Sequence, residues 1–188
     1  SFLMSGLGLF MSTTHLGKPK RFYRGFNNLR LSPVSREGFG VALFMAFLGL
    51  HILFNLPGNT LFAEIWTTLF GFDLAAALPA TLMSGLSTLT GFLACLGGAG
   101  GLYYMMRCYR IPARPFWNHL QVQTSFGGNA LSVGTLVVSL FVLPFWLMSG
   151  YEYASALSLL ASLMALGMAI EGLGLIKHGS DMKKESHE

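Results

Sequence analysis

Four long apolar runs, separated by short polar loops, constrain this chain more than any other feature of its sequence. They cover residues 39–56, 80–106, 120–148 and 151–176. A helix needs about 20 residues to cross the hydrocarbon core of a bilayer, so each run is long enough to span it. Because the runs are continuous rather than alternating, they indicate helices and not the strands of a barrel. The sequence therefore predicts an all-α, polytopic transmembrane helix bundle in a single domain.

Residues 1–14 form a further apolar segment, but it has only about half the length of a span. It lacks the basic start and the cleavage site of a signal peptide. We interpret it as the end of a helix that begins upstream, so the expected fold is four full spans plus a partial first helix. The composition agrees with a membrane protein, since only 11% of the residues are charged, against about a quarter in soluble domains.

Residues 59–79 are also apolar, but they carry Glu64 and Asp73. Each carboxylate would cost about 2.5–3.5 kcal/mol at the bilayer centre. We therefore expect this stretch to lie at the interface as a short amphipathic helix. All twelve lysines and arginines then fall on one face of the membrane. The positive-inside rule would make that face cytoplasmic, whereas docking of an acidic partner subunit would give the same asymmetry.

The run at 80–106 is rich in small residues, including the sequence GGAGG at 97–101. Such residues let neighbouring helices approach closely in a membrane. The last segment, residues 177–188, is polar, and we expect a flexible tail there.

Residues 14–38 form a basic loop between the partial helix and the first full span. His15 lies where the apolar helix leaves the membrane, and Glu37 lies where the next helix enters it. The loop's cations are Lys18, Lys20, Arg21, Arg24, Arg30 and Arg36.

His15 and Glu37 can meet near one membrane surface, together with Arg21, Arg107 and Tyr109 from the same face. A proton acceptor at the interface, ringed by arginines and aromatics above an apolar cleft, is what quinol oxidation requires, and histidine titrates near neutral pH. The alternative is that His15 caps a helix C-terminus and Glu37 an N-terminus, each favourable for the helix dipole. The spacing leaves both interpretations open.

Glu171 lies inside the last span, close to the basic face. Carboxylates within a membrane face the protein interior and are functional candidates. Glu171 is therefore either part of a proton relay or paired with Arg107 or with the lysines of the tail. We interpret His178 as a surface residue and His51 as a buried polar contact.

The sequence favours no metal or haem site. Cys95 and Cys108 lack the spacing of metal or redox motifs and are interpreted as packing residues. Haem b is held by histidine pairs on facing spans, and neither His15 nor His178 lies within a span. Basic residues beside aromatics can bind nucleic acid, but at membrane depth they favour lipid headgroups or a partner protein.

Residues 15–40, HLGKPKRFYRGFNNLRLSPVSREGFG, combine a histidine, a leucine-glycine, a proline, a basic-aromatic pair and a serine-x-glutamate that opens the next helix. This pattern closely resembles a loop signature of the DmsC family, the membrane anchor subunits of dimethyl sulfoxide reductase. RCYRIPARPFWNH at 107–119 is similar to a second motif of that family, and EGLGLIKH at 171–178 is a weaker third match. Together the matches cover most of residues 10–180.

The resemblance implies an eight-helix, haem-free anchor in the bacterial inner membrane that oxidises menaquinol. It would hold a molybdopterin catalytic subunit and a four-cluster iron–sulfur subunit, so those cofactors would lie in partner subunits and this chain would not act on the terminal substrate. The family's quinol-site histidine falls on His15, and its associated glutamate on Glu37. This chain would contain the end of the second helix through the sixth, either as a fragment or as a shortened relative.

Two other functions are weighed against this one. The chain could be a structural anchor that docks a redox partner without binding quinone. A small transporter is less compatible with the sequence, because the broken helices and midplane charges of such sites are missing from the runs.

Overall fold

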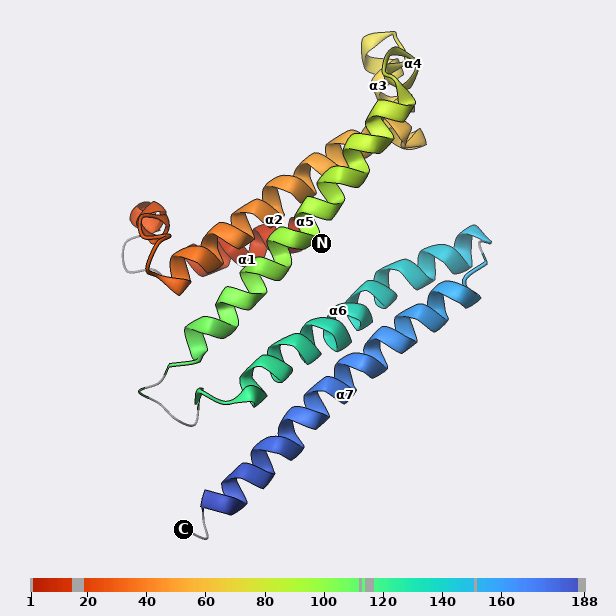
Figure 1. The fold of residues 1–188 in the computed structure, drawn as a ribbon. Helices are drawn as coiled ribbons and strands as arrows, with labels where there is room; N and C mark the ends of the chain where they lie inside the picture. Colours follow the sequence, from red (N-terminus) through yellow and green to blue (C-terminus); the bar gives the residue numbers. More distant parts are fainter. Residues whose placement is uncertain (1, 15–18, 112, 114–116, 151, 186–188) are drawn as a thin grey trace. The chain divides into compact units, whose positions relative to one another are not determined.

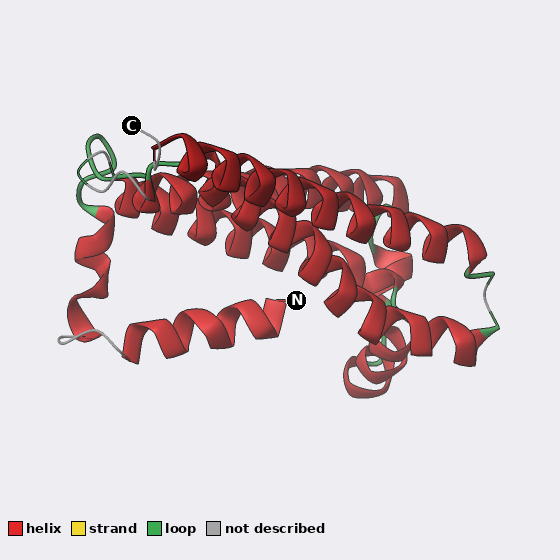
Figure 2. Ribbon diagram, turned by 90° about the horizontal axis from the view of Figure 1, so that it is seen from below, coloured by secondary structure: helices red, strands yellow, loops and turns green. Residues whose placement is uncertain are grey.

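The computed structural model describes residues 2–14, 19–111, 113, 117–150 and 152–185. The described residues form helices and loops, with no strand among them (Figure 2). Four helices are long and apolar enough to cross a membrane, and a shorter apolar helix lies at the N-terminus (Figure 1). The prediction of an all-α, polytopic bundle with four full spans is confirmed, and a short apolar helix is found where a partial first helix is predicted. The chain divides into two compact units, Ser1–Met105 and Met106–Glu188.

The first unit is built around two long helices, α2 and α5, that run antiparallel to each other. Near one end Gly40 of α2 lies against Gly101 of α5, and near the other end Asn55 contacts Ser87. The helices reaching into this unit are α1 (Phe2–Thr14), η1 (Pro19–Phe26), α2 (Pro33–Asn55), η2 (Leu56–Gly58), α3 (Thr60–Phe70), α4 (Leu74–Ala77) and α5 (Ala80–Tyr109).

Helix α2 begins earlier than the apolar run that predicts it. Ser32 caps its N-terminus by accepting a hydrogen bond from the Ser35 backbone N–H at 3.3 Å. Pro33 occupies the first turn, where its missing N–H costs nothing. The charged residues Arg36 and Glu37 therefore belong to the first turns of α2 and not to a loop.

Helices α2 and α5 touch backbone to backbone through glycines. A Cβ atom added at Gly40 would lie 2.5 Å from the Gly101 nitrogen, and one at Gly97 would lie 2.8 Å from the Phe44 nitrogen. In lipid no hydrophobic force draws two apolar helices together, so such close contact supplies the dispersion energy that does.

Residues 59–79 form the two short helices α3 and α4 rather than one of span length. The Asn59 side chain caps α3, which ends at Gly71 with φ at 76°, and Asp73 caps α4. The Trp66 ring lies 4.3 Å from the Phe70 ring and 5.7 Å from the Phe62 ring. The location of this segment at the membrane interface stays a prediction.

The second unit is a hairpin of α6 (Leu120–Ser149) and α7 (Ala154–Glu185). Glycines again bring the two backbones together, because a Cβ added at Gly167 would lie 2.6 Å from the Gly128 carbonyl oxygen. Helix α7 continues past Ile176 to Glu185, so much of the segment expected to be a flexible tail is helical.

Replacing Gly40 by alanine should weaken the packing of α2 on α5. The new methyl group meets the Gly101 backbone, which cannot move aside, and overpacking of this kind costs about 1–3 kcal/mol. We expect a lower midpoint of thermal unfolding in detergent, followed by circular dichroism. Gly85→Ala is the control, because no described residue outside that stretch of α5 lies within 4 Å of a Cβ at this position. Equal midpoints in the two variants would contradict the close contact.

Candidate functional site

Arg36 fastens the basic loop to the start of α2. Its Nε donates to the Leu29 carbonyl at 2.7 Å, and its Nη2 donates to the Arg30 carbonyl at 2.5 Å. The guanidinium also lies over the Tyr104 ring of α5, 5.3 Å from its centroid, which is within cation–π range. One side chain thus connects the loop, α2 and α5.

An apolar cavity of about 440 Å³ lies between α2 and α5 next to this guanidinium. Its volume is within the range of small-molecule sites, about 300–1,000 Å³. Among the described residues that line it, only Arg36 and Tyr104 carry polar side-chain groups. The lining residues are Leu29, Arg36, Phe39, Gly40, Leu43, Phe47, Leu93, Leu96, Gly97, Gly100 and Tyr104.

Of the two predicted proton acceptors, Glu37 is described, and it lies at the same end of the first unit as this cavity. Glu37 is partly exposed and follows Arg36 in α2, whereas His15 lies outside the described residues. Arg21 is exposed in η1, at a kink with φ at −106° and ψ at 15°. Element η1 packs on α2 through Phe26, whose ring atom Cε1 would lie 3.4 Å from a Cβ at Gly38.

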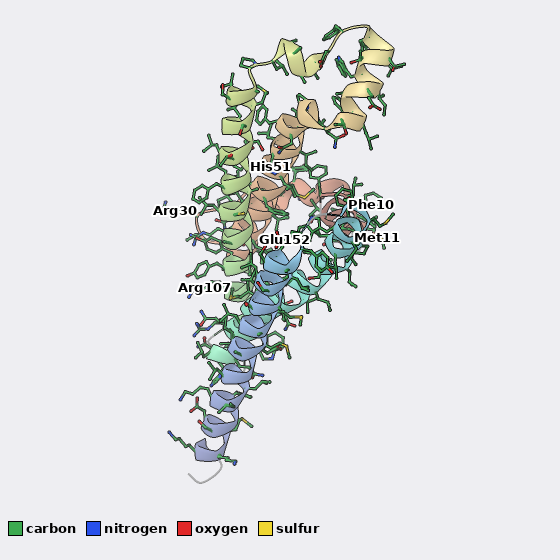
Figure 3. The ribbon with its side chains drawn as sticks, turned by 90° about the vertical axis from the view of Figure 1, so that its right-hand side faces the viewer. Phe10, Met11, Arg30, His51, Arg107 and Glu152 are labelled. Carbon is green, nitrogen blue, oxygen red and sulfur yellow. The ribbon has the colours of Figure 1, made fainter. Side chains whose placement is uncertain are left out.

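The other predicted residues, Arg107, Tyr109 and Glu171, belong to the second unit. Arg107 is exposed in the last turn of α5, where its side chain is seen in Figure 3. The Tyr109 ring lies 5.2 Å from the Phe126 ring and 6.1 Å from the Trp117 ring. These three aromatics line a second cavity, of about 290 Å³.

Glu171 is partly exposed in α7, and its Oε1 accepts a hydrogen bond from Asn129 Nδ2 at 3.1 Å. The same amide nitrogen donates to the Ser125 carbonyl at 2.9 Å. This contact joins α6 to α7 one turn from the glycines that bring the helices together. The sequence analysis considered Arg107 and the tail lysines as partners of Glu171, and it did not consider this neutral amide.

A polar cluster at the end of the hairpin was missed by the sequence analysis. His119 Nδ1 accepts from the Gln121 backbone N–H at 3.1 Å and so caps α6. Its Nε2 therefore carries the proton and donates to Asp181 at 3.0 Å, and Lys177 Nζ contacts the same carboxylate at 2.9 Å. The His178 ring lies 4.7 Å from the His119 ring, and His178 is partly buried rather than a surface residue. Lys177 and Asp181 are four residues apart in one helix, and this spacing could have predicted their ion pair from the sequence.

No group of three histidine, cysteine or acidic residues is placed to hold a metal ion in the part of the chain that the structure describes.

Four apolar helices of span length define this chain as a multi-pass membrane protein. Comparison with known proteins adds no name to that class, since no family model, no curated protein and no solved structure matches the chain. Membership of the DmsC family stays a prediction from the motifs at 15–40, 107–119 and 171–178.

Replacing Arg36 by lysine should free the loop from α2. Lysine keeps the charge but lacks the planar fork that reaches two carbonyls and covers the Tyr104 ring. We expect trypsin to cut after Arg30 about fivefold faster, as the loss of about 1 kcal/mol of local contacts implies. Arg24→Lys, at an exposed position of η1, is the control. Unchanged cleavage in Arg36→Lys would show that the guanidinium does not hold the loop.

Replacing Asp181 by asparagine should loosen the end of α7. The variant removes the charge that pairs with Lys177 and holds the proton of His119. We expect faster amide hydrogen exchange in residues 178–185, measured by mass spectrometry on the purified protein. Lys184→Gln removes an exposed charge from the same turns and serves as the control. If both variants exchange alike, the cluster does not stabilise this end of the hairpin.

Proposed function

We propose that this chain is a membrane anchor subunit of the DmsC type, which binds menaquinol beneath the basic loop and passes its electrons to a docked iron–sulfur subunit. The observation that carries the proposal is the apolar cavity of about 440 Å³ with Arg36 and Tyr104 among its lining residues. The cavity runs along two helices of span length, so a quinol could place its ring there and keep its tail in the hydrocarbon.

The cavity fits what a quinol needs. Its apolar lining matches the ring, and the Arg36 guanidinium is a donor that favours negative charge on a ring oxygen. Oxidation of the two hydroxyl groups releases two protons, which need acceptors close by. Glu37 follows Arg36 in α2 and is the proposed first acceptor, and His15 is the proposed second.

The other residues of the proposed site are taken from the chain's motifs. We assign Arg21, Arg107 and Tyr109 to binding of the quinol head or of the partner, and Glu171 to a proton path. The chain itself would hold no haem, cluster or molybdopterin, and those iron–sulfur and molybdopterin groups would lie in the docked subunits. We place the complex in the bacterial inner membrane.

Exposed arginines support docking of an acidic partner. Arg21, Arg24 and Arg30 are all exposed in and beside η1, which gives this end of the first unit a positive surface. Complementary charge steers a partner and fixes its orientation. The same surface favours the second candidate function, a structural anchor that docks a redox subunit without binding quinone.

A substitution that fills the cavity beneath the basic loop distinguishes quinol binding from the structural-anchor function. Leu93→Trp places an indole in the cavity, whereas Leu89→Trp places one at an exposed position one turn earlier on α5. We expect Leu93→Trp to weaken binding of a menaquinol analogue at least about fivefold, because steric overpacking costs about 1–3 kcal/mol. Binding is measured by equilibrium dialysis with the purified protein. Equal binding by both variants would remove the cavity as the quinol site.

The proton acceptors are tested in the assembled complex. Glu37→Gln and His15→Ala should leave assembly intact and abolish quinol-coupled reduction. If both variants turn over normally while Leu93→Trp also binds the analogue normally, the structural-anchor function is the better description.

A further inference from the structure

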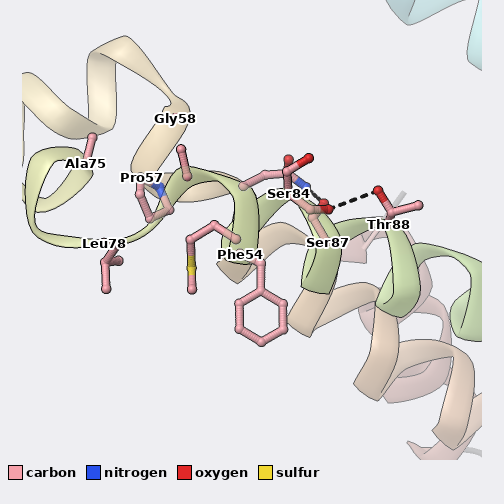
Figure 4. Close-up of a pocket in the computed structure, with 11 residues that line it drawn as sticks. Phe54, Pro57, Gly58, Ala75, Leu78, Ser84, Ser87 and Thr88 are labelled. Atoms are coloured by element: carbon pink, nitrogen blue, oxygen red, sulfur yellow. Dashed lines mark hydrogen bonds between the residues drawn. The ribbon is translucent and has the colours of Figure 1, made fainter.

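A second cavity in the first unit lies at the other end of α2 and α5, away from the basic loop (Figure 4). It has a volume of about 310 Å³ and is bounded by the end of α2, by η2 and α4, and by the start of α5. One wall is apolar and includes Phe54 and Met83. The other wall carries the polar side chains Asn55, Ser84, Ser87 and Thr88.

His51 lies on α2 beside α5 (Figure 3). It forms a hydrogen bond to the backbone of Ser87, one of the residues of the polar wall. Its Nδ1 lies 2.8 Å from the Ser87 carbonyl oxygen. A carbonyl can only accept, so Nδ1 carries the proton and donates it. The ring fits against α5 because residue 91 is glycine, where a Cβ would lie 3.0 Å from Nδ1.

The Ser87 hydroxyl is thereby left as a donor without an acceptor among the described residues. The hydroxyl oxygen accepts a hydrogen bond from Asn55 Nδ2 at 2.5 Å and lies 3.2 Å from the protonated His51 Nδ1. These two N–H groups therefore face the lone pairs of the oxygen. The remaining hydrogen-bonding group is the O–H proton, which cannot be donated to either of these two donors. Ser87 is only 6% exposed, and its side chain lines the cavity. A buried donor without a partner carries a free-energy cost that a ligand acceptor would remove.

The neighbouring hydroxyl of Thr88 differs in this respect. Thr88 Oγ1 donates to the Ser84 carbonyl at 2.9 Å, so its proton is already used (Figure 4). Two hydroxyl groups of adjacent residues therefore line the same cavity, one with its donor satisfied and the other with its donor available.

We propose that this cavity binds an uncharged amphiphile whose head carries a carbonyl oxygen, with that oxygen accepting a hydrogen bond from Ser87 Oγ. The head is uncharged because none of the described residues that line the cavity is a lysine, arginine, aspartate or glutamate. The rest of the ligand is apolar because the cavity adjoins the ends of two helices of span length and is lined by apolar side chains, among them Phe54 and Met83. The proposal does not rest on the quinol site beneath the basic loop.

A quinone ring and the ester of a neutral lipid both supply this chemistry. The experiment therefore uses two probes, the short naphthoquinone menadione and dioctanoylglycerol. The whole chain is placed in phosphatidylcholine nanodiscs and carries Leu93→Trp, which closes the cavity beneath the basic loop. Binding of each probe is measured by equilibrium dialysis.

Ser87→Ala should weaken binding of the true ligand class about three- to tenfold, the value of one hydrogen bond. The variant keeps the bond from His51, because that bond goes to the backbone carbonyl. Thr88→Val removes the neighbouring hydroxyl and should leave affinity unchanged. Ser87→Cys keeps the volume with a weaker donor and should fall between wild type and Ser87→Ala.

The probe whose binding depends on Ser87 identifies the source, quinone or neutral lipid. Met83→Trp fills the cavity from its apolar wall and should abolish binding even if Ser87→Ala folds poorly. The proposal is overturned if neither probe binds, or if Ser87→Ala and Thr88→Val bind equally. Because these measurements leave Arg36 and Glu37 untouched, failure here does not bear on the proposed quinol site.

Discussion

Backbone contact between glycines is the interaction on which both units depend. In lipid, apolar side chains gain nothing by leaving one hydrocarbon surface for another, so dispersion at short range must hold the helices together. Gly40 and Gly101 provide that contact between α2 and α5, and Gly128 and Gly167 provide it between α6 and α7. The polar contacts of each unit lie beside these points: Asn129 and Glu171 can meet only because the backbones of α6 and α7 are already close.

The spans could be predicted from the sequence because run length alone distinguishes a membrane helix. Their ends could not, because they depend on hydrogen bonds to neighbouring residues. Arg36 and Glu37 belong to a helix because Ser32 caps it and the Arg36 side chain satisfies two carbonyls of the preceding loop. In the same way α7 extends to Glu185 because Asp181 is held by Lys177 within the helix and by His119 across the hairpin.

The candidate site was less predictable than the fold, because it depends on which residues face each other across two helices. The sequence marked the basic loop and Glu37, and these lie near the apolar cavity that quinol binding would require. It did not mark Tyr104, since a tyrosine near the end of a span is ordinary until an arginine of another helix is seen above it. His51 was interpreted as a polar contact, and it is one, but its partner Ser87 emerges only from the antiparallel register of α2 and α5.

The cavity beneath the basic loop and the tight helix packing have the same origin. A glycine removes a side chain, which lets the facing backbone approach at one angle and leaves space at another. In the GGAGG segment Gly97 and Gly101 face α2 at close range, as the sequence predicts, whereas no part of α2 or of another described element lies within 4 Å of a Cβ at Gly100. Gly40, Gly97 and Gly100 all line the cavity, together with larger side chains such as Leu43 and Leu96. A substitution that filled this space would therefore act on the helix contact as well as on any ligand, which is why a test of binding should enlarge Leu93 and leave the glycines unchanged.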